Sequence, residues 1–379
     1  RLFTNWGQQP FKYTPPSNHL ALCTQNFPDP GVDKGADYFD TKLYTGNGAS
    51  SPGSSGGTQN ITGYGFSPDF LWIKDTGNGN HDHNLADTVR GAPNLVLSND
   101  TRAQITDSTD GLTGFLSDGF SLGDNGDGTQ SMELNKNGNS FVAWAWEAAD
   151  SNTSNSDGAT GSTVRANTTS GFSIVKWTNP SGSTTVGHGL GSKPHAIFTK
   201  GLGSCEWQVY HHSIDNNYKL YLDDDDAKVS SSVWGSTDPT STVFTFDDNR
   251  QQDFIAYCFK KVEGYSDFGE YVGATGNSVY PFVYTGFRPA WIMHKRVDSG
   301  GANVGDWRIW DTARDPYNAA TAMLKPNGPQ ASSADAAHSV DILSNGFKWR
   351  TADSNINANG GTYVYFAFAE HPFKTSRAR

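Results

Sequence analysis

The stretch "GFRPAWIMHK" at residues 286–295 occurs in related form twice earlier in the chain, as "GFSPDFLWIK" (65–74) and "GSKPHAIFTK" (191–200). In each copy a proline follows a glycine by three positions and precedes a lysine by six; the prolines are Pro68, Pro194 and Pro289, and the lysines are Lys74, Lys200 and Lys295. Proline is tolerated where a strand begins because no ladder donor is needed there. The glycine allows the preceding turn to adopt a positive φ. We therefore expect each copy to mark the entry strand of one of three homologous units.

A second phrase closes each unit, as "FVAWAW" (141–146), "FIAYCF" (254–259) and "YVYFAF" (363–368). Bulky and small residues alternate in it, as expected for a strand whose two faces meet different neighbours. Upstream of it, "LSDGF" (116–120) and "LSNGF" (343–347) predict a turn followed by a strand in the first and third units.

A third phrase lies between the other two. "DTVR" (87–90) recurs as "DTAR" (311–314), and the middle unit has "WQVYHHS" (207–213) where the last has "WRIWDTA" (307–313). The middle unit has only "VFTFDDN" (243–249) in place of the turn and strand, so its match is weaker. Strands thus recur while loop lengths differ.

Composition also favours an all-β protein. Aromatic residues make up 13% of the chain, glycines number 42 and charged residues are 18%, which suits many short strands joined by tight turns. The units run over 36–150, 171–264 and 265–379, lengths at which each can bury its own core as an antiparallel sandwich. Residues 151–170 read as an exposed linker. Helical periodicity is weak, and "DPYNAATAMLK" (315–325) is one short helix at most.

The charge pattern excludes some classes of protein. The net charge is −11, and only six of the 39 acidic residues are glutamates, which fits loops and strand ends rich in aspartate. An acidic surface is a poor nucleic-acid binder. No apolar run approaches the length that spans a bilayer. The three cysteines, Cys23, Cys205 and Cys258, form no disulfide framework, and Cys258 reads as a core residue.

Three polar segments are candidate metal sites. "HDH" (81–83) with Asp87 offers imidazole and carboxylate ligands. "LDDDD" (222–226) and "GDNGDG" (123–128) offer the oxygens that Ca²⁺ prefers, but without the spacing of an EF-hand loop. Polar, solvated turns are the favoured alternative for all three, so we predict no metal and no cofactor.

Catalytic patterns are weak. Glu147, Glu263 and Glu370 follow the closing strand of their units, and that repetition favours a structural role. His188 in "VGHGLG" reads as a hydrogen-bonding turn residue. No nucleophile or metalloprotease motif is found, so no catalytic residue is assigned.

The tryptophans divide by context. Those inside strand phrases, Trp72, Trp144, Trp146 and Trp291, are predicted to be core. Trp234 and Trp349 lie among polar residues, where stacking on a sugar is one interpretation and partly exposed edge packing is the favoured one.

The phrases resemble a known family. The run from "ANTTSGFSIVKWT" (166–178) through "FIAYCFKKVEGYSDFGEYVG" (254–273) to "YVYFAFAEHPFK" (363–374) is similar to a domain repeated in tail-fibre and related virion proteins of bacteriophages, especially marine ones. The resemblance covers 36–379. Residues 1–35 resemble the closing strands of the SPRY-like, concanavalin-type sandwich that often precedes this repeat.

The resemblance implies a structural, extracellular component of the virion surface that contacts other virion proteins and the host. Exposed sheet edges favour association as a homo-oligomer, and loops on the rigid strands are expected to bind a cell-surface glycan or protein and so to contribute to host attachment. It brings no ligand-binding residues with it. A purely structural assembly or decoration protein is one alternative, and a polysaccharide-degrading tailspike enzyme is another. We expect a protein that is not an enzyme, does not bind nucleic acid and does not insert into a membrane.

Overall fold

The computed structural model describes residues 13–14, 16, 29–50, 53–77, 80–106, 110–125, 134–274, 280–301 and 304–371. These residues form antiparallel sheets with very little helix, which confirms the predicted all-β, sandwich-type fold. The helical elements are η2 (Gly35–Asp37), η3 (Ala336–His338) and α1 (Ser354–Asn357). No described helix has the length and apolar character needed to cross a membrane. The prediction for residues 1–35 lies largely outside the described residues.

The strands fall into three groups, which we call unit 1 (β1–β9), unit 2 (β10–β19) and unit 3 (β20–β28). In unit 1 the inner sheet has the order β1-β9-β3-β4-β5-β6 and the outer sheet β2-β8-β7. The bounds are β1 (Phe39–Thr45), β2 (Gln59–Thr62), β3 (Phe70–Asp75), β4 (Asn84–Asp87), β5 (Asn94–Leu97), β6 (Ile105–Thr106), β7 (Leu112–Leu116), β8 (Gly119–Leu122) and β9 (Ser140–Trp146).

Unit 2 has an inner sheet of order β10-β11-β12-β19-β14-β15 and the outer pair β13-β18, with a short β16-β17 ladder beside them. The bounds are β10 (Thr153–Asn155), β11 (Ser162–Asn167), β12 (Phe172–Thr178), β13 (Gly182–Gly187), β14 (Ala196–Gly201), β15 (Gln208–His211), β16 (Tyr218–Lys219), β17 (Val229–Ser230), β18 (Val243–Asp248) and β19 (Asp253–Phe259).

Unit 3 has an inner sheet of order β20-β28-β22-β23 and the outer sheet β21-β27-β26, with a short β24-β25 ladder. The bounds are β20 (Ser266–Val272), β21 (Phe282–Tyr284), β22 (Trp291–Arg296), β23 (Arg308–Asp311), β24 (Ala322–Met323), β25 (Ser333–Ala334), β26 (Val340–Leu343), β27 (Gly346–Trp349) and β28 (Thr362–Phe368).

The repeated phrases occupy equivalent places. Pro68, Pro194 and Pro289 each stand two residues before a strand of an inner sheet, β3, β14 or β22. Each of these strands pairs with the closing strand of its unit in the same register, as shown by the Cα partners Phe70 and Trp146, Ala196 and Phe259, and Trp291 and Phe368. The phrase therefore marks an equivalent strand in each unit, as predicted. It is not the entry strand, because β1 and β2, β10–β13, and β20 and β21 come before it in their units.

Each inner sheet has two apolar faces, which explains the near-continuous apolar runs of its central strands. One face packs on the outer sheet of the same unit and forms a separate apolar cluster there. The other face of all three sheets contributes to one common cluster. The expectation that each unit has its own interior is thus correct for the outer faces, but the inner faces share a single core.

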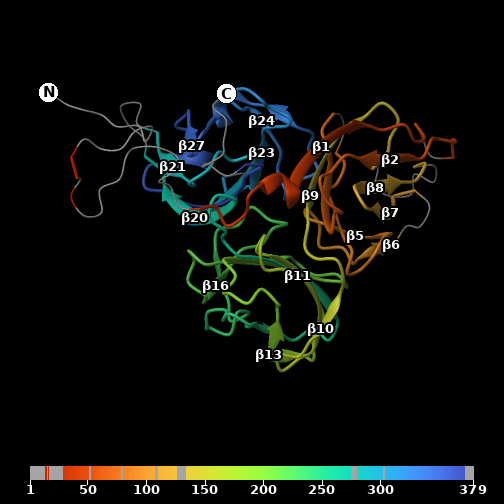
Figure 1. The fold of residues 1–379 in the computed structure, drawn as a ribbon, viewed down its shortest axis with the longest axis horizontal. Helices are drawn as coiled ribbons and strands as arrows, with labels where there is room; N and C mark the ends of the chain where they lie inside the picture. The colour runs from red at the N-terminus through yellow and green to blue at the C-terminus, as the bar shows by residue number, and fades with distance from the viewer. Residues whose placement is uncertain are drawn as a thin grey trace.

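The common core is centred on three rings from the ends of the closing strands, Trp146, Phe259 and Phe368. The ring centroids lie 6.4 Å apart for Trp146 and Phe259, 5.5 Å for Trp146 and Phe368, and 5.5 Å for Phe259 and Phe368. All three side chains are buried. The three units therefore lie around a common centre, as Figure 1 shows for unit 1 in orange, unit 2 in yellow and green and unit 3 in teal and blue.

The three repeated lysines join neighbouring units. Each is fully buried, and its Nζ donates to a backbone carbonyl of the next unit around the ring: Lys74 to Pro329 at 3.1 Å, Lys200 to Thr101 at 3.1 Å and Lys295 to Asp224 at 3.4 Å. Burial lowers the pKa of Lys74 to about 8 and of Lys295 to about 7, because the charged ammonium loses its water. The lysine of unit 1 thus donates to unit 3, that of unit 2 to unit 1, and that of unit 3 to unit 2.

The "DTVR" and "DTAR" phrases form a second set of joints. Within its own phrase, the Asp87 carboxylate accepts from Arg90 at 2.6 Å, and it also accepts from the Tyr257 hydroxyl of unit 2 at 2.9 Å. The Asp311 carboxylate accepts from Arg314 at 2.5 Å and from the indole N–H of Trp144, in unit 1, at 3.2 Å. The ring closes where unit 1 meets unit 3, and there the Ala36 N–H donates to the Glu370 carbonyl at 2.7 Å.

One sequence-based expectation is wrong. Residues 151–170 are not a linker, because they contain β10 and β11, which extend the inner sheet of unit 2. They look polar because most side chains of these two strands are polar; Val164 is their one buried apolar side chain. Residues 315–325, for which we expected one short helix at most, contain none; they form bends and β24, which pairs with β25.

We expect the three units to unfold in one transition, because the central rings belong to all of them. Phe259→Ala removes a buried ring and should destabilise the protein by about 3–5 kcal/mol, shifting the whole transition. Differential scanning calorimetry measures this as one peak with equal calorimetric and van't Hoff enthalpies. A separate early transition of unit 2 alone would contradict a shared core.

Candidate functional site

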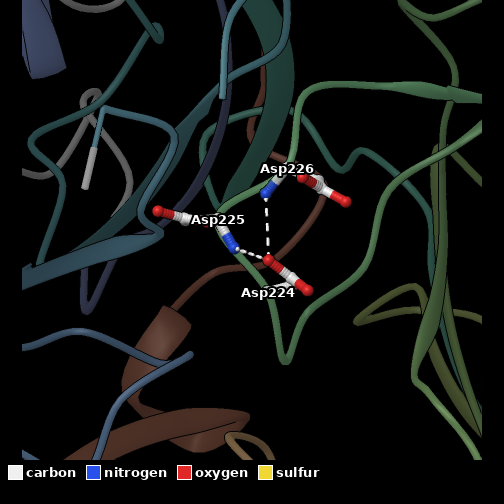
Figure 2. Close-up of side chains that lie close together, drawn as sticks. All are labelled: Asp224, Asp225 and Asp226. Carbon is white, nitrogen blue, oxygen red and sulfur yellow. Dashed lines mark hydrogen bonds between the residues drawn. The ribbon is translucent and has the colours of Figure 1, made fainter. Parts of the chain in front are cut away.

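The acidic loop at 223–226 contains the cluster of described residues best placed to hold a metal ion. Carboxylate oxygens of Asp224, Asp225 and Asp226 lie within 4.8 Å of one another. Figure 2 shows, however, that the three side chains point in different directions, and that one Asp224 oxygen accepts from the backbone N–H of Asp225 at 2.6 Å and of Asp226 at 3.3 Å. These bonds form a turn typical of aspartate, so the loop is explained without an ion.

The other predicted metal ligands do not converge. His83 is buried and accepts through Nδ1 from the Trp72 indole at 2.9 Å, whereas His81 contacts the Asp75 carboxylate at 2.5 Å. Asp82 accepts from Arg102 at 3.2 Å, and Asp87 belongs to the joint with unit 2. In "GDNGDG" (123–128) only residues 123–125 are described.

A repeated backbone cap explains the first aspartate of the acidic loop. Positions 87, 211 and 311 are equivalent in the three units, and in each unit the backbone N–H four residues earlier donates to a side-chain oxygen. The Asn99 oxygen accepts from His83 at 2.9 Å, the Asp223 oxygen from Trp207 at 3.1 Å and the Asn327 oxygen from Trp307 at 3.0 Å. Units 1 and 3 use asparagine here, and unit 2 uses aspartate.

Because position 223 is an aspartate, unit 2 lacks the side-chain amide donor that the asparagines provide in units 1 and 3. The amide nitrogens of Asn99 and Asn327 donate to the neighbouring carboxylates of Asp82 and Asp306, at 2.7 and 2.8 Å. In unit 2 the Asp223 carboxyl instead faces the charge of Glu206. Burial, with a smaller contribution from Glu206, raises the pKa of Asp223 to about 6.

The three glutamates are not equivalent, contrary to the sequence-based interpretation. Relative to the central rings, Glu147 follows Trp146 by one residue, Glu263 follows Phe259 by four and Glu370 follows Phe368 by two. Burial raises the pKa of Glu147 to about 7, and its Oε2 accepts from Asn167 at 2.5 Å. His188 is a hydrogen-bonding turn residue as predicted, because its Nδ1 accepts from the Leu190 N–H at 3.2 Å.

All six tryptophans singled out in the sequence are buried. Trp72, Trp144, Trp146 and Trp291 lie in the common core, as predicted. Trp234 and Trp349 are 1% and 0% exposed, so neither presents a face to a sugar, and the expectation of partial exposure is also wrong. Their polar neighbours in sequence face outward while the rings pack in the outer clusters of units 2 and 3. Cys258 is buried in the core as predicted.

Three histidines lie together where unit 2 meets unit 3. Ring centroids of His195 and His212 are 4.7 Å apart, and those of His211 and His212 are 5.2 Å apart. His211 occupies the joint position that Asp87 and Asp311 occupy elsewhere, and its ring contacts Phe366. Burial, and then the neighbouring His212, lower the pKa of His195 to about 4 and of His211 to about 3.

A polar hollow opens on the inner sheet of unit 2. The lining residues come from β10 and β11, from the segment between them, and from the neighbouring strands β12 and β19. They are Ser154, Asn155, Ser156, Gly161, Ser162, Thr163, Lys176, Trp177, Thr178 and Asp253. Within this lining, Asp253 accepts from Lys176 at 3.0 Å and from Thr178 at 2.6 Å. Sequence reasoning missed this hollow because it assigned 151–170 to a linker; the alternating "STVRAN" (162–167) was the available signal.

Asp223→Asn should stabilise the protein at neutral pH. A carboxyl whose folded pKa is raised loses stability as the pH rises from about 4 to about 6, since only the folded state retains the proton there. The amide has no such loss and can donate to Glu206, so we expect a gain of roughly 1–2 kcal/mol at pH 8 and little at pH 4. Urea unfolding at both values measures it, with Asp226→Asn in the exposed part of the loop as control. An equal gain at both pH values would contradict the role of ionisation.

Acid should destabilise the protein through the histidine group. A histidine whose folded pKa is lowered stabilises the protein above the unfolded value of about 6.5, and this stability is lost as the pH falls towards the folded pKa. We expect His211→Gln to reduce the loss of unfolding free energy between pH 7 and pH 5 by roughly 1–2 kcal/mol. The exposed His371→Gln serves as control. Identical acid sensitivity of the two variants would show that His211 has no part in it.

Comparison with known proteins identifies a family for this chain. No curated protein and no solved structure matches the chain. A family model described as a domain of unknown function, DUF7483, matches residues 34–372, and this range includes the strands of all three units. The chain therefore belongs to the DUF7483 family.

Proposed function

We propose that the protein is a non-enzymatic component of a virion surface, of tail-fibre type, which contributes to host attachment through groups displayed on a rigid β scaffold. Two things support the proposal. One is the resemblance of the three repeated phrases to the repeat of phage tail-fibre proteins. The other is the way in which the described units are joined.

The joints between units are the observation that carries the proposal. Each neighbouring pair of units is connected by a buried lysine bonded across the boundary and by a packed joint at positions 87, 211 and 311. Connections of this kind hold three sandwiches in fixed relative positions. Loops on a rigid scaffold are where recognition usually resides, and a homo-oligomer would multiply weak contacts to a cell surface.

An experiment on particles tests the proposal. Antibodies raised against the recombinant chain should label the outside of virions that carry it in electron micrographs, and the soluble chain should slow adsorption of those virions to host cells by competition. Labelling without competition would indicate an assembly or decoration protein. Absence of labelling on intact particles would overturn the proposal.

A control addresses the enzymatic alternative. Host polysaccharide incubated with the chain should keep its length and yield no new reducing ends. Shortened polymer would show a tailspike-type depolymerase instead.

A further inference from the structure

Unit 2 departs from the other two units in one place. Its inner sheet has β10 and β11 beyond β12, where units 1 and 3 end at the equivalent edge strands β1 and β20. Its outer sheet lacks a counterpart of β7 and β26 beside β18, and at the opposite edge of that sheet Thr160 bridges to Val186 of β13. The polar hollow lies along these added residues, so it has no counterpart in the other described units.

Hydrogen bonds within unit 2 fix Asn155 and Ser162 in the lining of the hollow, while the hydroxyl groups of other lining residues remain available to a ligand. The Asn155 amide bonds Asp157 through both of its polar atoms and packs on Gly187, where a Cβ would lie 1.7 Å from its oxygen. Ser162 donates to the Gly187 carbonyl at 2.8 Å. By contrast, the exposed hydroxyls of Ser154, Ser156 and Thr163 make no side-chain hydrogen bond within the described part of the chain.

The charge of the hollow is balanced. Lys176 and Asp253 form an ion pair at 3.0 Å with both side chains more than a third exposed, so each keeps unused hydrogen-bonding capacity on its solvent side. The position of Lys176 in β12 is occupied by Leu43 in β1 and by Glu270 in β20, as the shared register of these strands shows. The ion pair and its hydroxyl neighbours are therefore a property of unit 2 alone.

These features select a class of ligand. A neutral ion pair does not favour an anion such as phosphate, and a lining that presents hydroxyl, amide and charged groups favours a ligand with hydrogen-bonding groups of its own. Closely spaced donors and acceptors that are already held in position suit a ligand with several hydroxyl groups at similar spacing, because pre-organised partners lose little entropy on binding. Trp177 reaches the lining but its side chain is buried, so binding would depend on hydrogen bonds rather than on stacking.

We propose that the hollow between β10, β11, β12 and β19 binds a neutral saccharide. The inference rests on the proposed function, for which it names the recognition site and the ligand class. Asp253, fixed by Lys176 and Thr178, accepts hydrogen bonds from sugar hydroxyls, and Ser154, Ser156 and Thr163 exchange further bonds around it.

Gly161 provides a clean test of the site. It lines the hollow, its φ lies outside the left-handed region, and the nearest atom to an added Cβ is the Asn155 carbonyl oxygen at 3.9 Å. Gly161→Leu should fill the hollow without straining the backbone. The matched control is Gly77→Leu in unit 1, an exposed glycine whose added Cβ also meets atoms only at 3.5 Å or more.

The labelled full chain would be applied to a printed array of neutral and acidic bacterial oligosaccharides, with thermal melting to confirm that each variant is folded. We expect the wild type and Gly77→Leu to retain the same neutral glycans, Gly161→Leu to lose them, and Asp253→Asn to bind about tenfold more weakly, as expected for loss of one charged acceptor. Retention by a folded Gly161→Leu, or wild-type binding to acidic glycans alone, would overturn the site.

The array result separates the two proposals. If the wild type binds no neutral glycan while it still labels virions and competes for adsorption, then the saccharide site is wrong and the attachment function stands. If it binds neutral glycans through Gly161 but labels no particle, then the site stands and the virion function is wrong.

Discussion

Contact between three aromatic rings at one centre is the constraint on which the rest of the structure depends. Trp146, Phe259 and Phe368 end the closing strands of their units, and they touch because the inner sheets all turn the same face inward. That face is apolar and too large to leave in water, so burial requires the other two units. The boundary positions follow from this geometry. Lysines that would lie in solvent on an isolated sandwich are enclosed between units, where their ammonium groups need carbonyl partners.

Repetition made much of the fold predictable. The spacing of Pro68, Pro194 and Pro289 placed three strands correctly, because proline and glycine constrain the backbone locally. The alternation in "FVAWAW" and its copies predicted two-faced strands, but it did not reveal that the second face meets other units. Apolar patterning records that a face is buried and carries no information on what covers it. The same limit explains why Lys74, Lys200 and Lys295 were recognised as repeated but not as joints.

The candidate site was less accessible from sequence. The acidic run at 222–226 attracted attention as a metal site, yet one of its aspartates caps a backbone N–H and another forms a turn. Trp234 and Trp349 were misjudged because their neighbours in sequence are polar, while burial depends on where the ring points. The hollow of unit 2 was not predicted because β10 and β11, which line it, are polar edge strands with the composition of a linker. Departures from the repeat, such as aspartate at 223, histidine at 211 and the strands β10 and β11, are defined only by the strand register that the three units share.

The hydrogen bond between Ala36 and Glu370 bears on how the assembly of three units can be inserted into a longer polypeptide. It places residues 36 and 370, which flank the first and last strands of the three units, next to each other, so the chain enters and leaves the three-unit assembly at neighbouring positions. A polypeptide that contains this ring as an insertion needs to bridge only that short gap, and the entropy lost in closing it is small because the ends are already held together. Insertion into a loop of another domain, and gain or loss of a whole ring between flanking segments, would leave the parent fold undisturbed.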